Sequence, residues 1–262
     1  MGKIVVGERL AWFKDRADRH DFWEKHWEGS KETTSRRIEK ARQGCRGLYK
    51  KIFNKWIPKN EPVLEGGCGV GQIVMALQST GYDVVGVDFS DKTIQNSKKI
   101  APDLNIEHGD IFNLNFPDNH FGAYISFGVV EHYHDGPGEA FKEAYRVTKP
   151  GGVFICSVPF FSPIRRLRVL LGDYTFSEKP DKDNFYQYAF TKKEFTGLLS
   201  SYGFSVIETY CQAAVLGARK EVWGFERLYK LMPGIVRKGI SRIELGKSFV
   251  GHMIIFIAVK DK

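Results

Sequence analysis

The nine residues Val63-Leu64-Glu65-Gly66-Gly67-Cys68-Gly69-Val70-Gly71 carry the clearest structural signal in the chain. Val63 and Leu64 predict a short buried strand, and the apolar pattern from Gln72 to Ser79 predicts a helix. The glycines between them allow positive φ angles and let the backbone pass close to a ligand. A strand, a glycine-rich turn and a helix in this order predict one unit of a parallel α/β sheet.

Strands and helices continue to alternate along the rest of the chain. Further strands are expected over 84–88, 104–106, 123–127, 153–158, 204–209 and 253–259. Helices are expected over 92–100 and 137–147 and from Thr191 onward. This rhythm predicts an α/β fold that is doubly wound, with a mostly parallel, seven-stranded, Rossmann-like sheet covered by helices on both faces.

The carboxyl edge of such a sheet is where ligands bind, so the glycine turn marks the candidate site. Asp88 ends the second strand, where a carboxylate can accept both ribose hydroxyls of an adenosine. Counted from Gly67, an NAD fingerprint needs glycine at position 72, which is Gln72 here. An acid just ahead of the glycines, Glu65, suits a cationic ligand. The spacing therefore favours a nucleoside with a cationic tail over NAD.

Five segments in order resemble the class I S-adenosylmethionine-dependent methyltransferases, and specifically their small-molecule branch, which includes quinone and metabolite methyltransferases. The resemblance covers residues 63–158 and rests on the glycine turn and four later segments, Val85-Gly86-Val87-Asp88-Phe89-Ser90, Gly109-Asp110-Ile111, Val130-Glu131-His132 and Lys149-Pro150-Gly151-Gly152. It implies a methyltransferase that uses S-adenosyl-L-methionine as its cofactor. Many relatives have a bulkier residue where Gly66 stands, so we expect a looser turn with an unmoved carboxylate.

The resemblance also implies a role for each matching position. Gly67 and Gly69 would pass beneath the methionine and ribose, with Glu65 near the amino group and Asp88 on the ribose hydroxyls. The adenine would lie against three residues, Phe89, Asp110 and Ile111, with Asp110 accepting from its amino group. The backbone at Phe127 would border the methionine moiety. No metal ligand is implied.

Methyl transfer to a hydroxyl or an activated C–H needs a base within hydrogen-bond reach. The best-placed candidates lie in Glu131-His132-Tyr133-His134-Asp135, beyond the carboxyl end of the fourth strand. His132 is the first choice as catalytic base and His134 the second. The alternative, that Glu131 and His132 only shape this loop, stays open.

The chain is expected to form a single methyltransferase domain over 1–262. Its parts are an N-terminal helical cap over 1–60, a cofactor-binding core over 61–159, an insertion or lid over 160–190, and a C-terminal part over 191–262 that carries a helical insertion over 212–248. The cap has aromatic residues at helical spacing, Phe22, Trp23 and Trp27 with His26. Aromatic residues of the lid are expected to line the acceptor pocket: Phe160, Phe161, Tyr174, Phe176, Phe185, Tyr186 and Tyr188.

The composition sets the broad class of the protein. Hydrophobic residues make up 42% and charged residues 27%, as is ordinary for a globular protein. The longest apolar run, Met253 to Val259, is too short to span a bilayer, and the first residues lack an export signal. The four cysteines lie far apart with no CxxC pair, so neither disulfides nor a zinc site is expected. These features predict a cytoplasmic protein.

The partner is expected to be a small-molecule acceptor, with O- or C-methylation of an aromatic, prenylated or lipid-linked precursor. Nucleic acid is not favoured, because Ser126-Phe127-Gly128-Val129 replaces the Asn/Asp-Pro-Pro-aromatic motif and no Pro-Cys pair follows the fifth strand. The net charge of +8 keeps an RNA methyltransferase open. An inactive cofactor-binding partner protein also stays open. The mixed basic and apolar segments 160–171 and 228–238 either pack as lids or contact a membrane surface peripherally. The oligomeric state is left open.

Overall fold

The computed structural model describes residues 2–13, 31–177, 182, 184–240 and 246–261. Its main element is a seven-stranded sheet with strand order β10-β11-β7-β6-β3-β4-β5. Among these strands only β11 runs antiparallel to its neighbours. The strands are β3 (Val63–Gly66), β4 (Val84–Asp88), β5 (Ile106–His108), β6 (Phe121–Phe127), β7 (Thr148–Pro159), β10 (Phe204–Gln212) and β11 (Met253–Lys260). The predicted doubly wound, mostly parallel sheet is therefore confirmed; β5 starts two residues later than expected.

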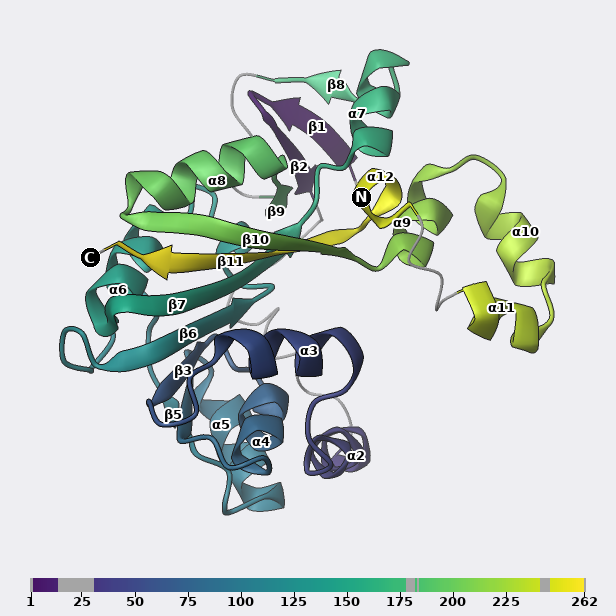
Figure 1. Ribbon diagram of the computed structural model, residues 1–262. Coiled ribbons are helices and arrows are strands. Elements are labelled where there is room, and N and C mark those ends of the chain that lie inside the picture. The colour runs from purple at the N-terminus through teal and green to yellow at the C-terminus, as the bar shows by residue number, and fades with distance from the viewer. Residues whose placement is uncertain (1, 14–30, 178–181, 183, 241–245, 262) are drawn as a thin grey trace.

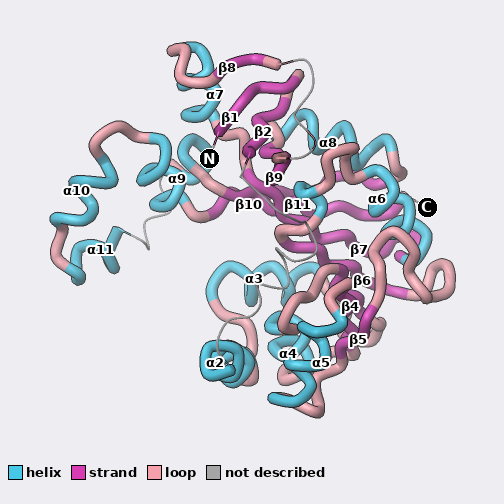
Figure 2. Tube along the Cα trace, turned by 180° about the vertical axis from the view of Figure 1, so that it is seen from behind, coloured by secondary structure: helices cyan, strands magenta, loops and turns pink. Residues whose placement is uncertain are grey.

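Helices cover both faces of this sheet (Figures 1 and 2). One face packs against α6 (Gly138–Val147) and α8 (Lys192–Ser201), which bury Phe141 and Phe195. The other face packs against α3, α4 and α5. These three span Gly47–Trp56, Gln72–Gln78 and Asp91–Ile100. Because both faces are covered, the strands consist of nearly continuous apolar residues.

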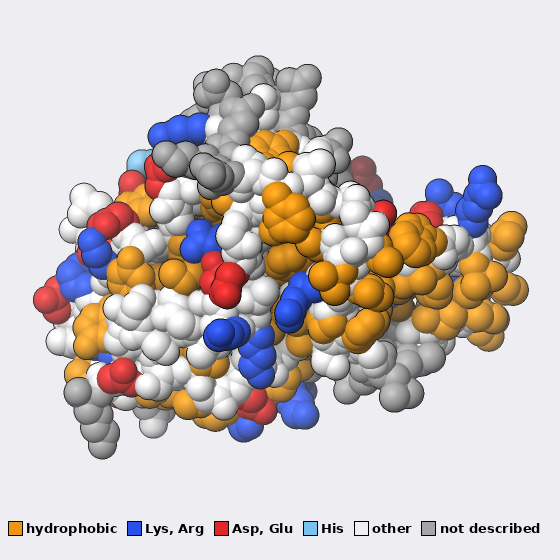
Figure 3. All heavy atoms as spheres, turned by 90° about the horizontal axis from the view of Figure 1, so that it is seen from above, with side chains coloured by type: hydrophobic (Ala, Val, Ile, Leu, Met, Phe, Trp, Pro, Cys, Tyr) orange, Lys and Arg blue, Asp and Glu red, His pale blue; other side chains and the backbone are white. Residues whose placement is uncertain are grey.

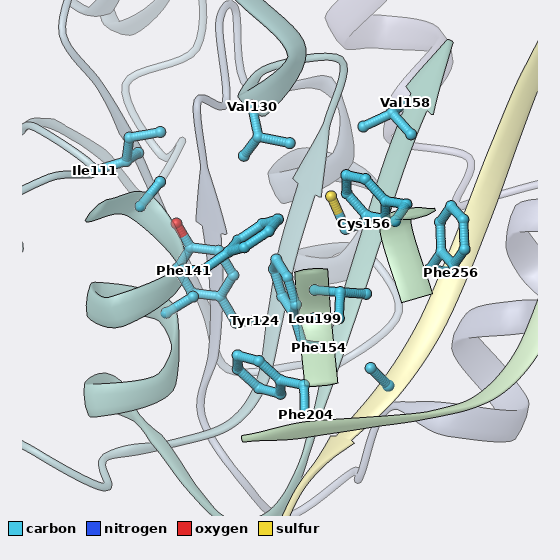
Figure 4. Close-up of a cluster of buried hydrophobic side chains, with 14 of the residues drawn as sticks. Ile111, Tyr124, Val130, Phe141, Phe154, Cys156, Val158, Leu199, Phe204 and Phe256 are labelled. Carbon is cyan, nitrogen blue, oxygen red and sulfur yellow. The ribbon is translucent and has the colours of Figure 1, made fainter. Parts of the chain in front are cut away.

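The core beneath α6 and α8 is built largely of aromatic rings (Figure 4). Phe154 on β7 lies at its centre, with ring centroids 5.8 Å from Phe141 and 5.0 Å from Phe204. Tyr124 on β6 approaches the same ring at 5.3 Å. Burying each ring stabilises the fold by about 1.5–3 kcal/mol, so this core fixes β6 and β7, whose carboxyl ends border the site.

A second, four-stranded sheet was not predicted from the sequence. Its order is β8-β1-β2-β9, and in Figure 1 it stands above the main sheet. Its strands are β1 (Gly2–Val6), β2 (Arg9–Phe13), β8 (Thr175–Phe176) and β9 (Phe185–Ala189). Helix α7 (Pro163–Leu170) lies beside this second sheet. Phe161 and Tyr174 pack with Trp12 in the hydrophobic core of the second sheet.

This sheet corrects two expectations. The helical cap over 1–60 is wrong for residues 2–13, which form a hairpin around Gly7 because β-branched and aromatic residues flank a turn with positive φ. The insertion over 160–190 is no simple lid either, since it supplies α7 and two strands of the sheet. Helices α2 (Lys31–Ala41) and α3 agree with the cap prediction. The helical spacing at 22–27 falls outside the described residues.

In the described part of the predicted helical insertion over 212–248, the structure has four short helices. They are α9 (Ala214–Glu221), α10 (Phe225–Leu231), α11 (Gly234–Ile240) and α12 (Lys247–Val250). The first three, residues 214–240, form an arm that extends away from the sheet (Figure 1). Across the described ranges, no helix has the length and apolar character to cross a membrane.

Candidate functional site

A cavity of about 700 Å³ opens at the carboxyl edge of β3, β4, β5 and β6. This volume lies in the upper part of the range of roughly 300–1,000 Å³ seen for small-molecule sites. Its lining comes from the turns that follow these four strands and from the start of α4: Glu65, Gly67, Cys68, Gln72, Ile73, Asp88, Phe89, His108, Gly109, Asp110, Ile111, Phe112, Phe127, Gly128, Val129, His132 and Tyr133. The cavity therefore occupies the position that the sheet topology predicts for a ligand.

The glycine turn forms the floor of this cavity. Gly67, Gly69 and Gly71 all have positive φ, of 74°, 52° and 75°. The N–H of Gly67 donates to the carbonyl of Val87 over 2.8 Å, which ties the turn to β4. A β-carbon at position 67 would collide with the side chain of Val129. The turn thus requires glycine both for its conformation and for the space across the cavity floor.

Gly66 does not loosen the turn, contrary to expectation. A β-carbon at this position would meet the hydroxyl group of Tyr124 and lie close to Ile111. Tyr124 is buried on β6, the strand next to β3. The large side chain on the neighbouring strand therefore fills the space that a bulkier residue would take, and the turn stays packed.

Glu65 is a buried carboxyl group at the end of β3. Burial raises its pKa to about 8, and the nearby Asp88 adds to this shift. Its Oε2 atom has no hydrogen-bond partner among the described residues, although the side chain lines the cavity. A buried carboxyl oxygen without a partner is costly. A cationic ligand group in the cavity would satisfy it.

Asp88 connects β4 to the glycine turn. Its Oδ2 accepts from the Gly69 N–H at 2.8 Å, and its Oδ1 accepts from the Ser90 N–H at 3.0 Å. Burial raises the pKa of this carboxyl group even though both bonds oppose the shift. Gly69 itself is not part of the cavity lining, and its N–H is bound to Asp88. Its predicted position beneath the ligand stays a prediction.

The remaining predicted cofactor residues Phe89, Asp110, Ile111 and Phe127 all line the cavity. Asp110 Oδ1 accepts from the Phe112 N–H over 3.0 Å, which folds the turn after β5. Phe127 stacks on Phe53 of α3 with 6.2 Å between ring centroids. Helix α3, which sequence analysis assigned to the N-terminal cap, therefore packs behind Phe127 and supports it, although no residue of α3 lines the cavity itself.

His132 lies in the cavity lining and is buried. Its Nδ1 is 2.8 Å from the backbone carbonyl of Tyr186. A carbonyl oxygen only accepts, so Nδ1 carries the hydrogen and Nε2 is the basic nitrogen of the neutral ring. Nε2 lies 3.9 Å from Oε1 of Glu131, a buried carboxyl group whose pKa burial raises to about 8. The geometry thus leaves His132 suited to accept a proton.

His134, the second candidate base, lies outside this lining. Its Nδ1 is 2.8 Å from Oδ1 of Asp135, and its carbonyl accepts from the hydroxyl of Tyr188 at 3.0 Å. A turn follows η1 (Val130–His132), closed by a hydrogen bond from the Gly136 N–H to the Tyr133 carbonyl at 3.1 Å, and His134 lies within this turn. The bond from Tyr188 ties the His134 backbone to β9, and the predicted role of His134 as second base stays a prediction.

Several lining residues escaped the sequence analysis. They include Gln72, Ile73, His108, Phe112, Val129 and Tyr133. The rings of Phe112 and Tyr133 meet edge to face at 4.4 Å and close one side of the cavity. Apart from Ile73, which lies in the first turn of α4, these residues stand beside a motif residue, and that position was the available signal. The aromatic residues predicted from 160–190 are absent from the lining; Phe160, Phe161, Phe185 and Tyr188 are buried in the two cores instead.

Comparison with known proteins places this geometry among methyltransferases. The sequence profile of the family described as "Methyltransferase domain" matches residues 64–156. A probable S-adenosylmethionine-dependent methyltransferase of Mycolicibacterium smegmatis is 31% identical over 166 residues, which cover 62% of this chain and 58% of that protein. A demethylmenaquinone methyltransferase of Staphylococcus epidermidis is 30% identical over 171 residues, covering 58% of this chain and 70% of that protein.

The solved structures agree in fold. A SAM-dependent methyltransferase from Methanosarcina mazei superimposes with a TM-score of 0.54 at 19% identity, covering 80% of this chain and 97% of that one. Other curated relatives are named as quinone or sterol methyltransferases. The chain spans from about a quarter to somewhat over half of the length of the first curated relatives that it matches.

Proposed function

Because the chain belongs to the S-adenosylmethionine-dependent methyltransferases, we propose that it methylates a small apolar acceptor. S-adenosyl-L-methionine is the cofactor of this family and supplies a methyl group bound to a cationic sulfur. The residues present fit this cofactor in two respects. The unpartnered Oε2 of Glu65 suits its cationic amino-acid end, and the backbone of the glycine turn at Gly67 and Cys68 lines the cavity where the cofactor would lie.

One observation carries the proposal: a single cavity joins two acidic side chains to an aromatic wall. Glu65 and Asp88 lie at the ends of β3 and β4, where the cofactor would be held. Phe112, Phe127 and Tyr133 come from the turns after β5 and β6 and offer apolar surface to an acceptor. Apolar surface buried there contributes about 25 cal/mol per Å². This lining favours an aromatic or prenylated acceptor over a highly charged one.

His132 is proposed as the catalytic base. Its Nε2 would take the proton that the acceptor loses while an acceptor oxygen or carbon gains the methyl group. The hydrogen bond from Nδ1 to Tyr186 holds the ring in the required tautomer. Glu131, close to Nε2, would stabilise the charged imidazolium if it is ionised at that moment. The buried position of both groups keeps bulk water away from the proton transfer.

The acceptor class is proposed to be quinone-like, that is, a ring with an activated C–H or a hydroxyl group. Support comes from the aromatic wall and from relatives named as quinone methyltransferases. Sterol methyltransferases among the relatives point to a similarly apolar substrate.

A label-partition assay tests this proposal. The protein is incubated with methyl-tritiated cofactor and a cell extract separated into lipid, RNA and polar-metabolite fractions. We expect label in the organic-soluble lipid fraction, and none there with His132→Gln. Label that enters only the RNA fraction would contradict a small-molecule acceptor and indicate a nucleic-acid acceptor. If the protein binds the cofactor but no fraction takes up label, the protein is a binding protein without methyltransferase activity.

A further inference from the structure

The arm of residues 214–240 lacks the burial that normally holds a helix in place. Neither α10 nor α11 contains a buried residue. Only α9 is anchored: Gly217 lies against the backbone of Val250, and Glu221 is buried in ion pairs with Arg165 and Lys3. The arm therefore has a fixed base and an exposed outer part.

Large apolar side chains occupy this outer part. Leu231 is 83% exposed and Ile235 is 82% exposed, although such residues are usually inside. Further exposed apolar residues lie on the arm or on the neighbouring α7 and the segment after it: Leu167, Leu170, Leu171, Phe176, Leu216, Val222, Trp223, Leu228 and Val236. Figure 3 shows hydrophobic side chains running continuously from the centre of this face out along the arm. Patches of this extent mark an interaction surface.

The charges around this surface are mostly positive. The arm carries six basic residues, Arg219, Lys220, Arg227, Lys230, Arg237 and Lys238, against the acids Glu221 and Glu226. Glu221 is buried at the base of the arm, and Glu226 is paired with Arg219 and Lys230 at 2.6 Å and 3.3 Å. The outer part thus combines exposed apolar groups with an excess of positive charge. An anionic surface with an apolar interior is complementary to both features.

We infer that the arm docks this protein on the surface of an anionic lipid bilayer. Leu231 and Ile235 insert between lipid chains, while Arg237 and Lys238 contact the anionic headgroups. The arm follows the carboxyl end of β10, and the cavity opens at the carboxyl ends of the parallel strands β3 to β6. Both therefore lie at the same edge of the sheet, so docking would bring the cavity near the bilayer. That last consequence rests on the proposed apolar acceptor; docking itself does not.

Flotation with vesicles tests the inference without cofactor or acceptor. The wild type is mixed with phosphatidylcholine vesicles that contain or lack phosphatidylglycerol, over a series of salt concentrations. We expect binding to the phosphatidylglycerol vesicles that weakens as salt rises. The double variant Leu231→Glu, Ile235→Glu should bind more than about tenfold more weakly, and Arg237→Gln, Lys238→Gln about tenfold more weakly.

Matched controls lie outside the arm. Ile207→Glu changes an exposed apolar residue of β10, and Lys98→Gln, Lys99→Gln removes two exposed charges from α5. Both control variants should bind vesicles like the wild type. Every variant should also keep its affinity for S-adenosylhomocysteine, and this retained affinity would show that the variant is folded. No flotation of the wild type, equal flotation with and without phosphatidylglycerol, or controls as weak as the arm variants would overturn the inference. So would a dimer that the arm variants dissociate, because a second copy would then cover the surface.

Discussion

The carboxyl edge of β3 to β6 and the outer arm of α10 and α11 differ in how their residues are held. At the sheet edge, Glu65 and Asp88 are buried and the glycine turn is fixed by hydrogen bonds to β4. In α10 and α11 no residue is buried, and large apolar side chains face solvent. Among the described residues, the side chains of the first region are held by other parts of this chain, whereas those of the second are not.

The comparisons with known proteins also separate these two regions. The family profile matches residues 64–156 and ends before the arm begins. Residues that hold the cofactor in this family therefore lie within the part that the relatives share. The four-stranded sheet and the arm lie outside the residues that this profile matches. The difference between the two regions shows that the cofactor can be inferred from sequence resemblance. The residues around the acceptor, in contrast, can be identified only from the structure.

The largest expected effect concerns turnover at the sheet edge. His132→Ala should lower kcat by about 10²–10⁴-fold, because a positioned base contributes that much to proton transfer. The affinity for S-adenosylhomocysteine should change little. The wild-type rate should also depend on pH through the protonation of His132, and His132→Ala should lack that dependence. Steady-state kinetics across pH, with His134→Ala as the control, check this; an unchanged kcat and pH profile in His132→Ala would leave His132 only a structural role.

The next effect concerns cofactor binding. Asp88→Ala should weaken binding of S-adenosylhomocysteine by roughly 2–4 kcal/mol, because two ribose hydroxyls and the Gly69 N–H lose their acceptor. Asp83→Ala, at an exposed position just before the start of the same strand, should bind like the wild type. Calorimetric titration measures both. Equal dissociation constants for the two variants would remove Asp88 from the cofactor site.

A smaller effect follows from the titration of Glu65. Burial raises its pKa to about 8, so at lower pH the group is mostly protonated and meets a cationic ligand uncharged. Affinity for S-adenosylhomocysteine should therefore rise as the pH increases from about 6 to about 8, by up to about tenfold per pH unit below that pKa. Glu65→Gln should flatten this dependence. A wild type whose affinity is constant over the same range would show that Glu65 does not face the cation.

The raised pKa of Glu65 also makes the free energy of unfolding depend on pH, in the direction opposite to the cofactor affinity. The pKa of Glu65 is raised in the folded state above its ordinary value, so its contribution to the free energy of unfolding is present at low pH. That contribution is lost as the pH rises from about 4.5 to about 8. The empty protein should therefore become less stable over the range in which it gains cofactor affinity, and bound S-adenosylhomocysteine should offset the loss.

The smallest effect is expected in the arm. Leu231→Glu should alter the free energy of unfolding by less than about 0.5 kcal/mol, because an exposed side chain without buried contacts contributes little. Leu64→Glu, at a fully buried position of β3, is the contrasting variant and should prevent folding. Thermal unfolding in the absence of lipid distinguishes them. A strongly destabilised Leu231→Glu would mean that the arm packs on the domain and is not an exposed surface.

Much of the sheet and its site could be predicted from the sequence. The strand–glycine–helix order and the apolar strands follow local rules, and a parallel sheet brings its carboxyl ends together. For that reason the sequence alone predicted seven site residues that all line the cavity: Glu65, Asp88, Phe89, Asp110, Ile111, Phe127 and His132. Their individual roles in binding and catalysis remain predictions.

What could not be predicted depends on pairing between distant segments. Residues 2–13 join β8 and β9, more than 150 residues away, so the second sheet has no local signature. The fit between Gly66 and Tyr124 involves neighbouring strands and could not be read from either residue alone. The orientation of His134 depends on the turn after η1. The aromatic residues of 160–190 were misplaced because aromatic density does not tell a core from a ligand pocket.

The central claim, that the sheet edge is built for a nucleoside with a cationic amino-acid tail, is tested most directly by one calorimetric comparison. The wild-type protein is titrated at about pH 8, where Glu65 is about half ionised, with S-adenosylhomocysteine and separately with NAD. The structure predicts saturable binding of S-adenosylhomocysteine and none of NAD under the same conditions. Tight binding of NAD with no response to S-adenosylhomocysteine would contradict it.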